Sequence, residues 1–138
     1  MADILLLDAE ALSALAHARR RAAAALRARA ILQVAYDHRA LVRVPAPVLA
    51  EVYRGGSRDA ALDLILGGTG IVVLDLTDRI ARRAGALLSA AKLDSAHAVD
   101  AFVVATAVCA GGALIATHDP DDLRRLAARA PEVRIWPI

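Results

Sequence analysis

Four acidic residues stand far apart in this 138-residue chain, each beside apolar residues. Asp8 directly follows one apolar run, and Asp119 comes shortly after another; Glu51 and Asp100 lie within apolar segments of helical character. A carboxylate at the end of a buried strand is costly unless it is paired or holds a cation. Because oxygen ligands without cysteine suit Mg²⁺ or Mn²⁺, these four acids predict a divalent-metal site.

A site of this kind performs recognisable chemistry. A bound Mg²⁺ or Mn²⁺ polarises a phosphoryl oxygen, activates a water and stabilises the leaving oxygen. Phosphodiester hydrolysis is the natural reaction, because the substrate brings further oxygens to the metal. Arg54, three residues after Glu51, is the preferred phosphate contact. His97 lies one helical turn before Asp100 on the same helix face. It could contact substrate phosphate, modulate Asp100 or be an ordinary, partly exposed helix residue. His118 is a candidate for lining the cleft.

The elements that must position these residues follow from apolar patterning and helix stop signals. Strands are predicted over 3–7, 41–44, 71–74, 113–116 and 133–136, and helices over 9–16, 19–37, 47–55, 58–66, 77–91, 95–110 and 120–128. In the second helix Leu26, Ala30 and Val34 share one face. Strands that alternate with helices, each strand a near-continuous apolar run, predict one α/β domain over 1–138, with a parallel sheet covered on both faces.

This topology explains how the acids could meet. In an open parallel α/β sheet, ligands bind beyond the carboxyl ends of the strands, at a topological switch point. Asp8 and Asp119 lie at such strand ends, and Glu51 is expected near the start of the helix after the second strand. Asp100 is expected in the second turn of the helix that leads into the fourth strand. One cleft could therefore receive all four carboxylates.

Composition limits the remaining function classes. The chain is 58% hydrophobic, with a net charge of +2 and a pI of about 9.2, which is compatible with a nucleic-acid partner without establishing one. The single cysteine, Cys109, excludes an internal disulfide and a cysteine-based zinc site.

The N-terminal residues lack the basic region of a signal peptide. The uncharged stretch 101–117 is shorter than the ~20 residues that span a bilayer. A soluble, cytoplasmic protein with no membrane association is expected.

The densest basic region allows three interpretations. It comprises Arg19, Arg20, Arg21, Arg27 and Arg29. These side chains could follow an RNA backbone, form a solvated helix face or dock an acidic partner.

The pattern of acids resembles the PIN domain, the nuclease fold of VapC-type toxins in bacterial toxin–antitoxin pairs. The matching pieces are Leu6-Leu7-Asp8-Ala9, Val44-Pro45-Ala46-Pro47-Val48-Leu49-Ala50-Glu51-Val52, Val99-Asp100-Ala101-Phe102-Val103-Val104-Ala105-Thr106-Ala107 and Leu114-Ile115-Ala116-Thr117-His118-Asp119. No single piece is specific, but the four in this order are fairly specific and extend over nearly the whole chain.

The resemblance implies a three-layer α/β/α domain with a central, mainly parallel five-stranded sheet. It implies Mg²⁺- or Mn²⁺-dependent endoribonuclease activity on RNA, a homodimer and inhibition by a small antitoxin protein. By this resemblance Asp8, Glu51, Asp100 and Asp119 are the catalytic and metal-binding acids, and Thr117 orients a water or a carboxylate.

The sequence departs from the family pattern in two places. Ala9 stands where the family often has a hydroxyl residue, and a missing hydroxyl could weaken metal binding. After Asp119 the family often has a further acid; Asp121 and Asp122 both follow, and their register with the pattern is ambiguous.

Two other functions remain open at this level. A phosphotransferase using Asp8 as an aspartyl nucleophile would need a second acid two residues later, which Glu10 serves only in part. It would also need a lysine near a strand end, and Lys92 is the only lysine of the chain. A non-catalytic interaction module on the same scaffold is the third hypothesis; the missing hydroxyl at Ala9 keeps it open, and the retention of all four acids argues against it.

Overall fold

Strands and helices alternate along the chain in the computed structural model, which describes residues 2–68 and 70–138. The strands are β1 (Ile4–Leu7), β2 (Leu41–Pro45), β3 (Ile71–Leu74), β4 (Ala113–Thr117) and β5 (Val133–Pro137). The helices are α1 (Ala9–Ala16), α2 (Ala22–Asp37), α3 (Ala46–Val52), α4 (Asp59–Gly67), α5 (Asp78–Ala91), the 3₁₀ turn η1 (Ser95–His97), α6 (Ala98–Cys109) and α7 (Pro120–Leu126). The predicted α/β alternation is confirmed.

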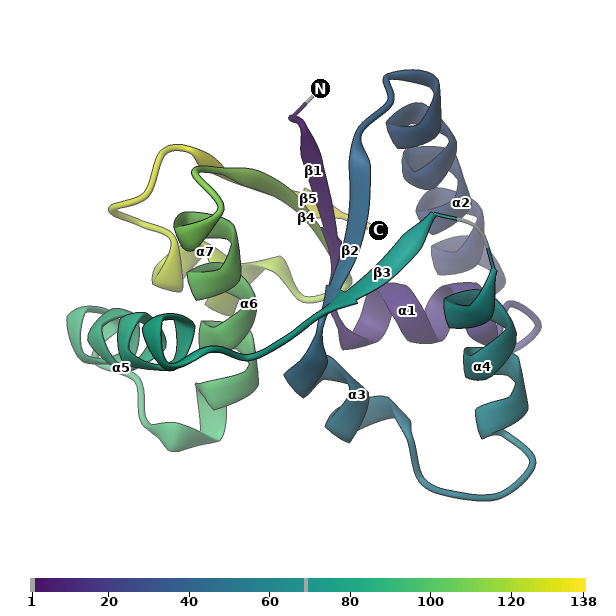
Figure 1. The fold of residues 1–138 in the computed structure, drawn as a ribbon, viewed down its shortest axis with the longest axis horizontal. Helices are drawn as coiled ribbons and strands as arrows, with labels where there is room; N and C mark the ends of the chain where they lie inside the picture. The colour runs from purple at the N-terminus through teal and green to yellow at the C-terminus, as the bar shows by residue number, and fades with distance from the viewer. Residues whose placement is uncertain (1, 69) are drawn as a thin grey trace.

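The strands form one parallel sheet in the order β3-β2-β1-β4-β5 (Figure 1). The central strand β1 contributes Leu5, Leu6 and Leu7, all of which are fully buried because both faces of the sheet are covered there. From β1 the chain moves outward through β2 and β3, and it returns to the other side of β1 as β4. The switch point of the sheet therefore lies between β1 and β4, at their carboxyl ends.

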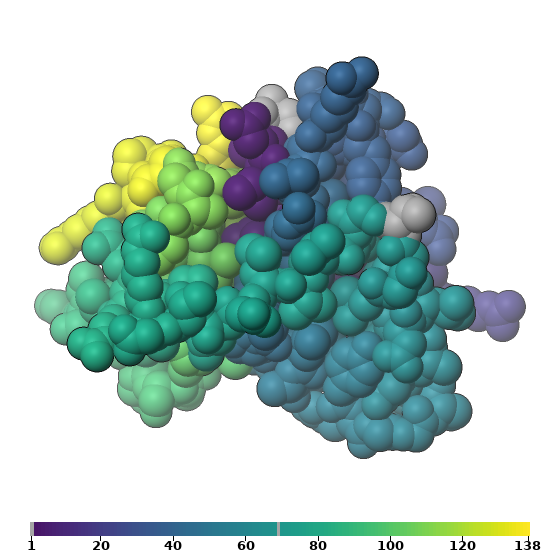
Figure 2. Space-filling view, viewed as in Figure 1, coloured from purple at the N-terminus to yellow at the C-terminus, as the bar shows by residue number. Residues whose placement is uncertain are grey.

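Two groups of helices enclose the sheet. The helices α5, α6 and α7 pack on one another on one side, and α2 and α4 pack with α1 on the other (Figure 1). The edge strand β3 and the following α5 run across the front of the molecule in the space-filling view (Figure 2). The result is a three-layer α/β/α arrangement. Within the described part of the chain, every helix is too short or too polar to span a bilayer.

Helix α2 differs from the predicted helix in its start and in its buried face. The expected start at Arg19 is wrong, because the chain reverses direction between α1 and α2, which pack against each other, and α2 begins at Ala22. Leu26, Ala30 and Val34 do share a face, but that face is exposed. The buried face consists of small residues and one isoleucine: Ala24, Ala25, Ala28, Ile31 and Ala35.

Helix α3 is shorter than predicted, which changes the position of Glu51. The helix ends at Val52 instead of continuing to the glycine pair, and Tyr53 is already extended. The cause is the Asp59 carboxylate, which accepts the backbone N–H groups of Arg54 at 3.2 Å and of Gly55 at 2.7 Å. Glu51 therefore lies in the last turn of α3, and its expected place near the helix start is wrong.

The approach to α6 also differs in detail. The Asp94 carboxylate accepts the backbone N–H of Ala96 at 2.9 Å, and this cap starts the 3₁₀ turn η1 instead of α6 itself. Helix α6 begins at Ala98, so Asp100 lies in its first turn and not in its second. Cys109, its last residue, is a half-buried free cysteine.

Candidate functional site

The carboxyl ends of β1 and β4 open into a small cleft of about 180 Å³. Every predicted catalytic residue lines it: Asp8, Glu51, Asp100, Thr117 and Asp119. Ala9, Glu10, Val99 and Val103 complete the lining. Residues of α1, α3, α6 and β4, together with Asp8 and Asp119 just beyond the ends of β1 and β4, thus meet at the switch point of the sheet.

Asp8 is the most deeply placed acid, with 6% of its surface exposed. It is the N-cap of α1, where its Oδ1 accepts the backbone N–H of Ala11 at 2.8 Å. Burial raises the pKa of Asp8 to about 6. Hydrogen bonds from Thr117 and from the Ala11 N–H lower this pKa, and the charges of Asp100 and Glu10 raise it. The fold therefore keeps this carboxylate charged at neutral pH only at an energetic cost.

Thr117 connects the two strand ends of the cleft. Its side chain is buried, with 1% exposed, and hydrogen-bonds to the carboxyl of Asp8. Its Oγ1 also accepts the backbone N–H of Asp119 at 3.1 Å and lies 3.3 Å from the Asp119 carbonyl oxygen. The hydroxyl has one proton, so it donates to only one of these oxygens at a time. Asp119 occupies the N-cap position of α7 but makes no side-chain capping bond, which leaves its exposed carboxylate available.

Asp100 belongs to a wider acidic group. Burial raises its pKa first, and the charges of Glu51, Asp122 and Asp119 raise it further, while His97 lowers it. The ligand atoms of His97, Asp100 and Asp122 lie within 4.8 Å of one another, and His97 Nδ1 is 3.4 Å from Asp122 Oδ2.

The register ambiguity after Asp119 is resolved by the side chains. Asp122 faces Asp100, whereas Asp121 is 89% exposed and lies 3.7 Å from Arg124. Asp122 is therefore the acid that joins the group, and Asp121 lies apart from it.

Two of the residues predicted to contact substrate, His118 and Arg54, lie outside the cleft. His118 is exposed, does not line the cleft, and its Nδ1 lies 3.0 Å from the backbone oxygen of Ile138. Arg54 also stays outside the cleft, and its guanidinium donates to the carbonyls of Ala50 and Tyr53, at 2.8 Å each. Arg54 instead lines a neighbouring hollow.

This hollow, the basic groove, adjoins the acidic cleft. It encloses about 370 Å³ and shares Ala9, Glu10 and Glu51 with the cleft. Its lining includes four arginines, Arg20, Arg21, Arg54 and Arg58, together with His17 and the acids Glu10, Glu51 and Asp59. A phosphate placed there would lie next to the carboxylates, and a bound cation would offset the repulsion between them.

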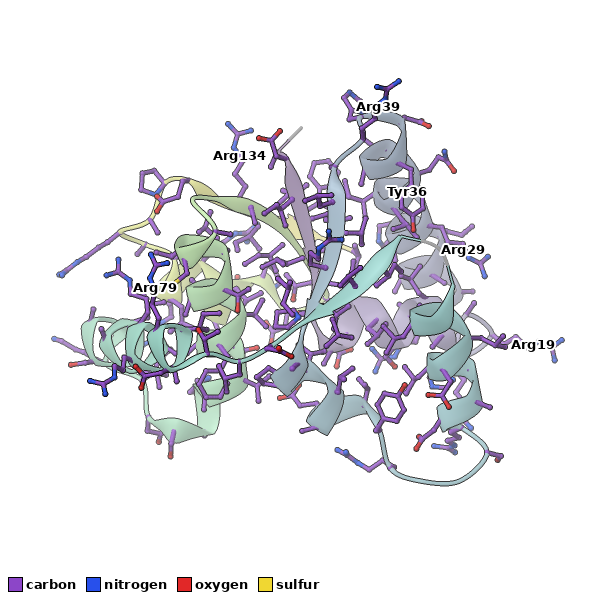
Figure 3. All side chains as sticks on the ribbon, viewed as in Figure 1. Arg19, Arg29, Tyr36, Arg39, Arg79 and Arg134 are labelled. Carbon is purple, nitrogen blue, oxygen red and sulfur yellow. The ribbon has the colours of Figure 1, made fainter. Side chains whose placement is uncertain are left out.

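The predicted basic region is divided among several surfaces. Arg20 and Arg21 line the basic groove, and Arg27 lines a separate hollow. Arg19 and Arg29 project outward from the body of the molecule (Figure 3). No single arginine face results, because these residues are distributed over two separate hollows and the outer surface.

Sequence reasoning missed Glu10 as a member of the cleft. Glu10 lies in the first turn of α1, and its carboxylate forms an ion pair with Arg21. Its position two residues after Asp8, at the same helix start, was the available signal. The ion pair links the acidic cleft to the basic groove.

The donor set fits a hard divalent cation. The cleft offers carboxylate oxygens and one hydroxyl, with no thiol, and such ligands suit Mg²⁺ or Mn²⁺. Asp8 and Asp100 each carry a raised pKa to which neighbouring carboxylates contribute. A divalent cation would offset this repulsion. Lys92, the only lysine, is the C-cap of α5 and does not line the cleft, so the phosphotransferase reading gains no support.

Comparison with known proteins adds an independent result. The family model described as PIN domain matches residues 5–129. Among solved structures, a chain of a toxin–antitoxin complex from Klebsiella pneumoniae has a similar fold, with a TM-score of 0.68 and 21% sequence identity. The similarity covers 97% of this chain and 99% of that one. Comparison with curated protein sequences gives no significant match.

Proposed function

The chain belongs to the PIN domain family, and we propose that it is a Mg²⁺- or Mn²⁺-dependent endoribonuclease that hydrolyses RNA phosphodiester bonds. The observation that carries this proposal is the convergence of Asp8, Glu51, Asp100 and Asp119 in one cleft at the β1–β4 switch point. Acids from four separate segments would repel one another without a cation. Cation binding explains why these acids converge, whereas the stability of the fold would not require it.

Each residue of the cleft has a distinct part in this proposal. Asp8, which is buried, and Asp100, which is half-buried, would hold the ion, and the exposed Glu51 and Asp119 would add further carboxylate ligands. Thr117 orients Asp8 through its hydroxyl. When bound, the ion would polarise the phosphoryl oxygen and activate a water.

The basic groove is proposed to hold the RNA backbone beside the cleft. Arg58 is exposed and lines the groove next to Glu51 and Arg54. Arg54 keeps a fixed direction through its bonds to two backbone carbonyls, and a guanidinium has further N–H groups for phosphate. His97, next to Asp100 and Asp122, is proposed to contact substrate or to modulate Asp100.

We further propose that the protein is the toxin of a type II toxin–antitoxin pair, as a homodimer of VapC type inhibited by a small antitoxin. The similar solved structure, which is described as a toxin–antitoxin complex, supports the toxin–antitoxin part of this proposal. The test is to read the adjoining open reading frame, express the two proteins together and determine whether they purify as one complex.

The activity is tested by incubating purified protein with a labelled pool of structured RNAs in Mg²⁺, Mn²⁺ or EDTA. Asp100→Asn is the active-site variant, and Asp78→Asn is the matched control, because Asp78 is an acid on α5 with 80% of its side chain exposed. Cleavage that is lost in EDTA and with Asp100→Asn, but kept with Asp78→Asn, supports the proposal. Intact RNA with a well-folded protein that binds no Mn²⁺ indicates a non-catalytic interaction module. Transfer of label onto Asp8 would indicate a phosphotransferase.

A further inference from the structure

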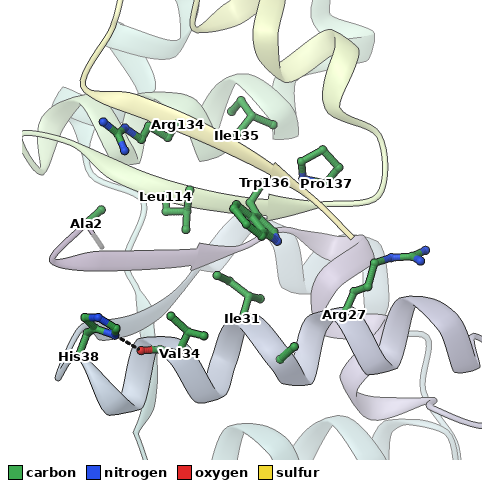
Figure 4. Close-up of a pocket in the computed structure, with 11 residues that line it drawn as sticks. Ala2, Arg27, Ile31, Val34, His38, Leu114, Arg134, Ile135, Trp136 and Pro137 are labelled. Carbon is green, nitrogen blue, oxygen red and sulfur yellow. Dashed lines mark hydrogen bonds between the residues drawn. The ribbon is translucent and has the colours of Figure 1, made fainter.

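A third hollow lies between α2 and the last strand β5, and we call it the α2–β5 groove (Figure 4). It encloses about 810 Å³ and shares no lining residue with the acidic cleft or with the basic groove. Neither the proposed chemistry nor the proposed RNA path uses it. It therefore needs an explanation of its own.

The groove exists because helices cover the sheet unequally on its α2 side. Helix α2 packs against β1 and β2, while β5 on the far side of β4 is covered mainly from the opposite face, by α6 and α7. The floor contains the buried Ile31 and Leu114. Val34 and Trp136 rise beside it with 39% and 48% of their surfaces exposed. Large apolar side chains gathered at an open hollow are typical of interaction sites.

The rim of the groove is cationic. Arg134 and His38 lie at one end and Arg27 at the other (Figure 4), and no acidic residue is among the lining residues. Within the described residues, neither Arg27 nor Arg134 has an ion-pair or hydrogen-bond partner for its guanidinium. The ring of His38 uses Nδ1 for a 2.9 Å bond with the Val34 oxygen, which leaves Nε2 directed elsewhere. The groove thus combines an apolar floor with unpaired positive charge at both ends.

We propose that the α2–β5 groove is the docking site for an amphipathic, acidic segment of a partner protein. Apolar side chains of that segment would cover Val34 and Trp136, and its carboxylates would meet Arg27 and Arg134 at the two ends. Charge complementarity selects this occupant, since opposite charges across an interface favour the correct partner and reject others. The proposal is independent of the nuclease activity and of metal binding.

The same charges disfavour two other occupants. A second copy of the chain, placed by two-fold symmetry on this groove, would bring the arginines of the two copies toward each other. A single-stranded nucleic acid would require stacking platforms along a continuous basic track, whereas the groove has one aromatic residue, Trp136, and an apolar floor.

Panning of displayed random 16-residue peptides on the full-length protein tests the proposal. We expect the wild type to enrich peptides that are apolar and net acidic. The double variant Arg27→Glu, Arg134→Glu should enrich apolar peptides with basic residues instead. Both arginines are exposed, so the reversal should leave the fold intact, which circular dichroism checks. Neutral or basic peptides on the wild type, or no enrichment at all, would overturn the proposal.

The best enriched peptide is then synthesised and titrated. Trp136 is the only tryptophan of the chain, so its fluorescence reports on this groove alone, and binding should shift its emission to shorter wavelength. By anisotropy of labelled peptide, Trp136→Ala should weaken binding at least tenfold. Leu64→Ala and Arg129→Glu are the matched controls, since Leu64 is 78% exposed on α4 and neither residue lines the groove; each should change affinity less than twofold.

Three results in this second stage would refute the proposal. Equal binding to the wild type and to Trp136→Ala would place the peptide elsewhere on the protein. Displacement of the peptide by a single-stranded RNA oligonucleotide from both the wild type and Asp100→Asn would assign the groove to nucleic acid. A wild-type dimer that becomes monomeric with Trp136→Ala, by light scattering, would assign it to a second copy. Failure of RNA cleavage in the earlier assay would leave the docking result unaffected, so the two proposals fail separately.

Discussion

Asp8→Asn is expected to stabilise the metal-free protein while it impairs the site. The physical reason is the buried carboxylate, whose pKa rises from 3.8 to about 6 on folding, chiefly through burial. At neutral pH the folded protein must keep this group charged in a place that favours its neutral form. Asparagine is neutral and isosteric, and it is an equally good N-cap, so it can still accept the Ala11 N–H.

The magnitude follows from linkage between protonation and folding. Each tenfold change in proton affinity corresponds to 1.36 kcal/mol, so a pKa of about 6 against 3.8 costs the charged form about 3 kcal/mol at pH 7.5. The sign is that of a raised acid pKa: the folded state binds the proton more tightly, so stability is lost as pH rises from about 4 to above 6. The advantage of Asp8→Asn should therefore shrink to about 1 kcal/mol at pH 4.5.

Urea unfolding in EDTA at several pH values measures the difference in free energy of unfolding between Asp8→Asn and the wild type. Asp94→Asn is the matched control, because Asp94 is also a capping acid but is exposed. This substitution should change the free energy of unfolding by no more than about 0.5 kcal/mol. Asp8→Ala separates the two contributions, since loss of the cap costs about 1 kcal/mol. An Asp8→Asn variant that is less stable than the wild type at pH 7.5, or a gain that does not depend on pH, would refute the reasoning.

Four further substitutions test the site and the fold. Thr117→Val should lower Mn²⁺ affinity on the order of tenfold by calorimetry, because it removes the hydroxyl that orients the buried carboxyl; unchanged affinity would contradict its role. Arg58→Ala should weaken binding of labelled RNA in EDTA and reduce the slope of log affinity against log salt by about 1, which anisotropy measures. Gly112→Ala should destabilise by about 1–3 kcal/mol, since φ is +128° and a Cβ would lie 2.9 Å from the Glu132 carbonyl oxygen. Gly85→Ala, in open space on α5, should instead stabilise by about 0.5–1 kcal/mol, and thermal unfolding compares the two.

Much of the site could be predicted because strand order and strand ends carry most of its geometry. Asp8 comes directly after the apolar run of β1, and Thr117 ends the apolar run of β4. These two strands are neighbours at the switch point, so their ends lie together. Asp100 lies in the first turn of its helix and not in the predicted second turn, but it still lines the cleft. The reason is that α6 is followed directly by β4, so the start of α6 lies at the carboxyl end of that strand. Errors of one helical turn matter little where the chain topology fixes the edge of the sheet at which a residue lies.

The remaining features depend on tertiary contacts that a local pattern does not contain. The early end of α3 results from Asp59 capturing two backbone N–H groups, which no helix propensity would indicate. The choice between Asp121 and Asp122 depends on the rotation of α7 after Asp119.

The buried face of α2 was equally hard to predict. The helix is rich in alanine on several sides, so apolar spacing does not select the face that meets the core. Val34, on the predicted face, instead stands at the edge of the α2–β5 groove.

Mn²⁺ titration by calorimetry at pH 7.5 tests the central claim most directly, namely that the converged acids form a cation site. The wild type and Asp78→Asn are predicted to bind Mn²⁺ with the same affinity, and Asp100→Asn is predicted to bind at least tenfold more weakly. Binding should also raise the wild-type unfolding temperature, because the cation stabilises only the folded state. Equal and weak Mn²⁺ binding by all three proteins would contradict the account, since the acids would then have converged without holding a cation.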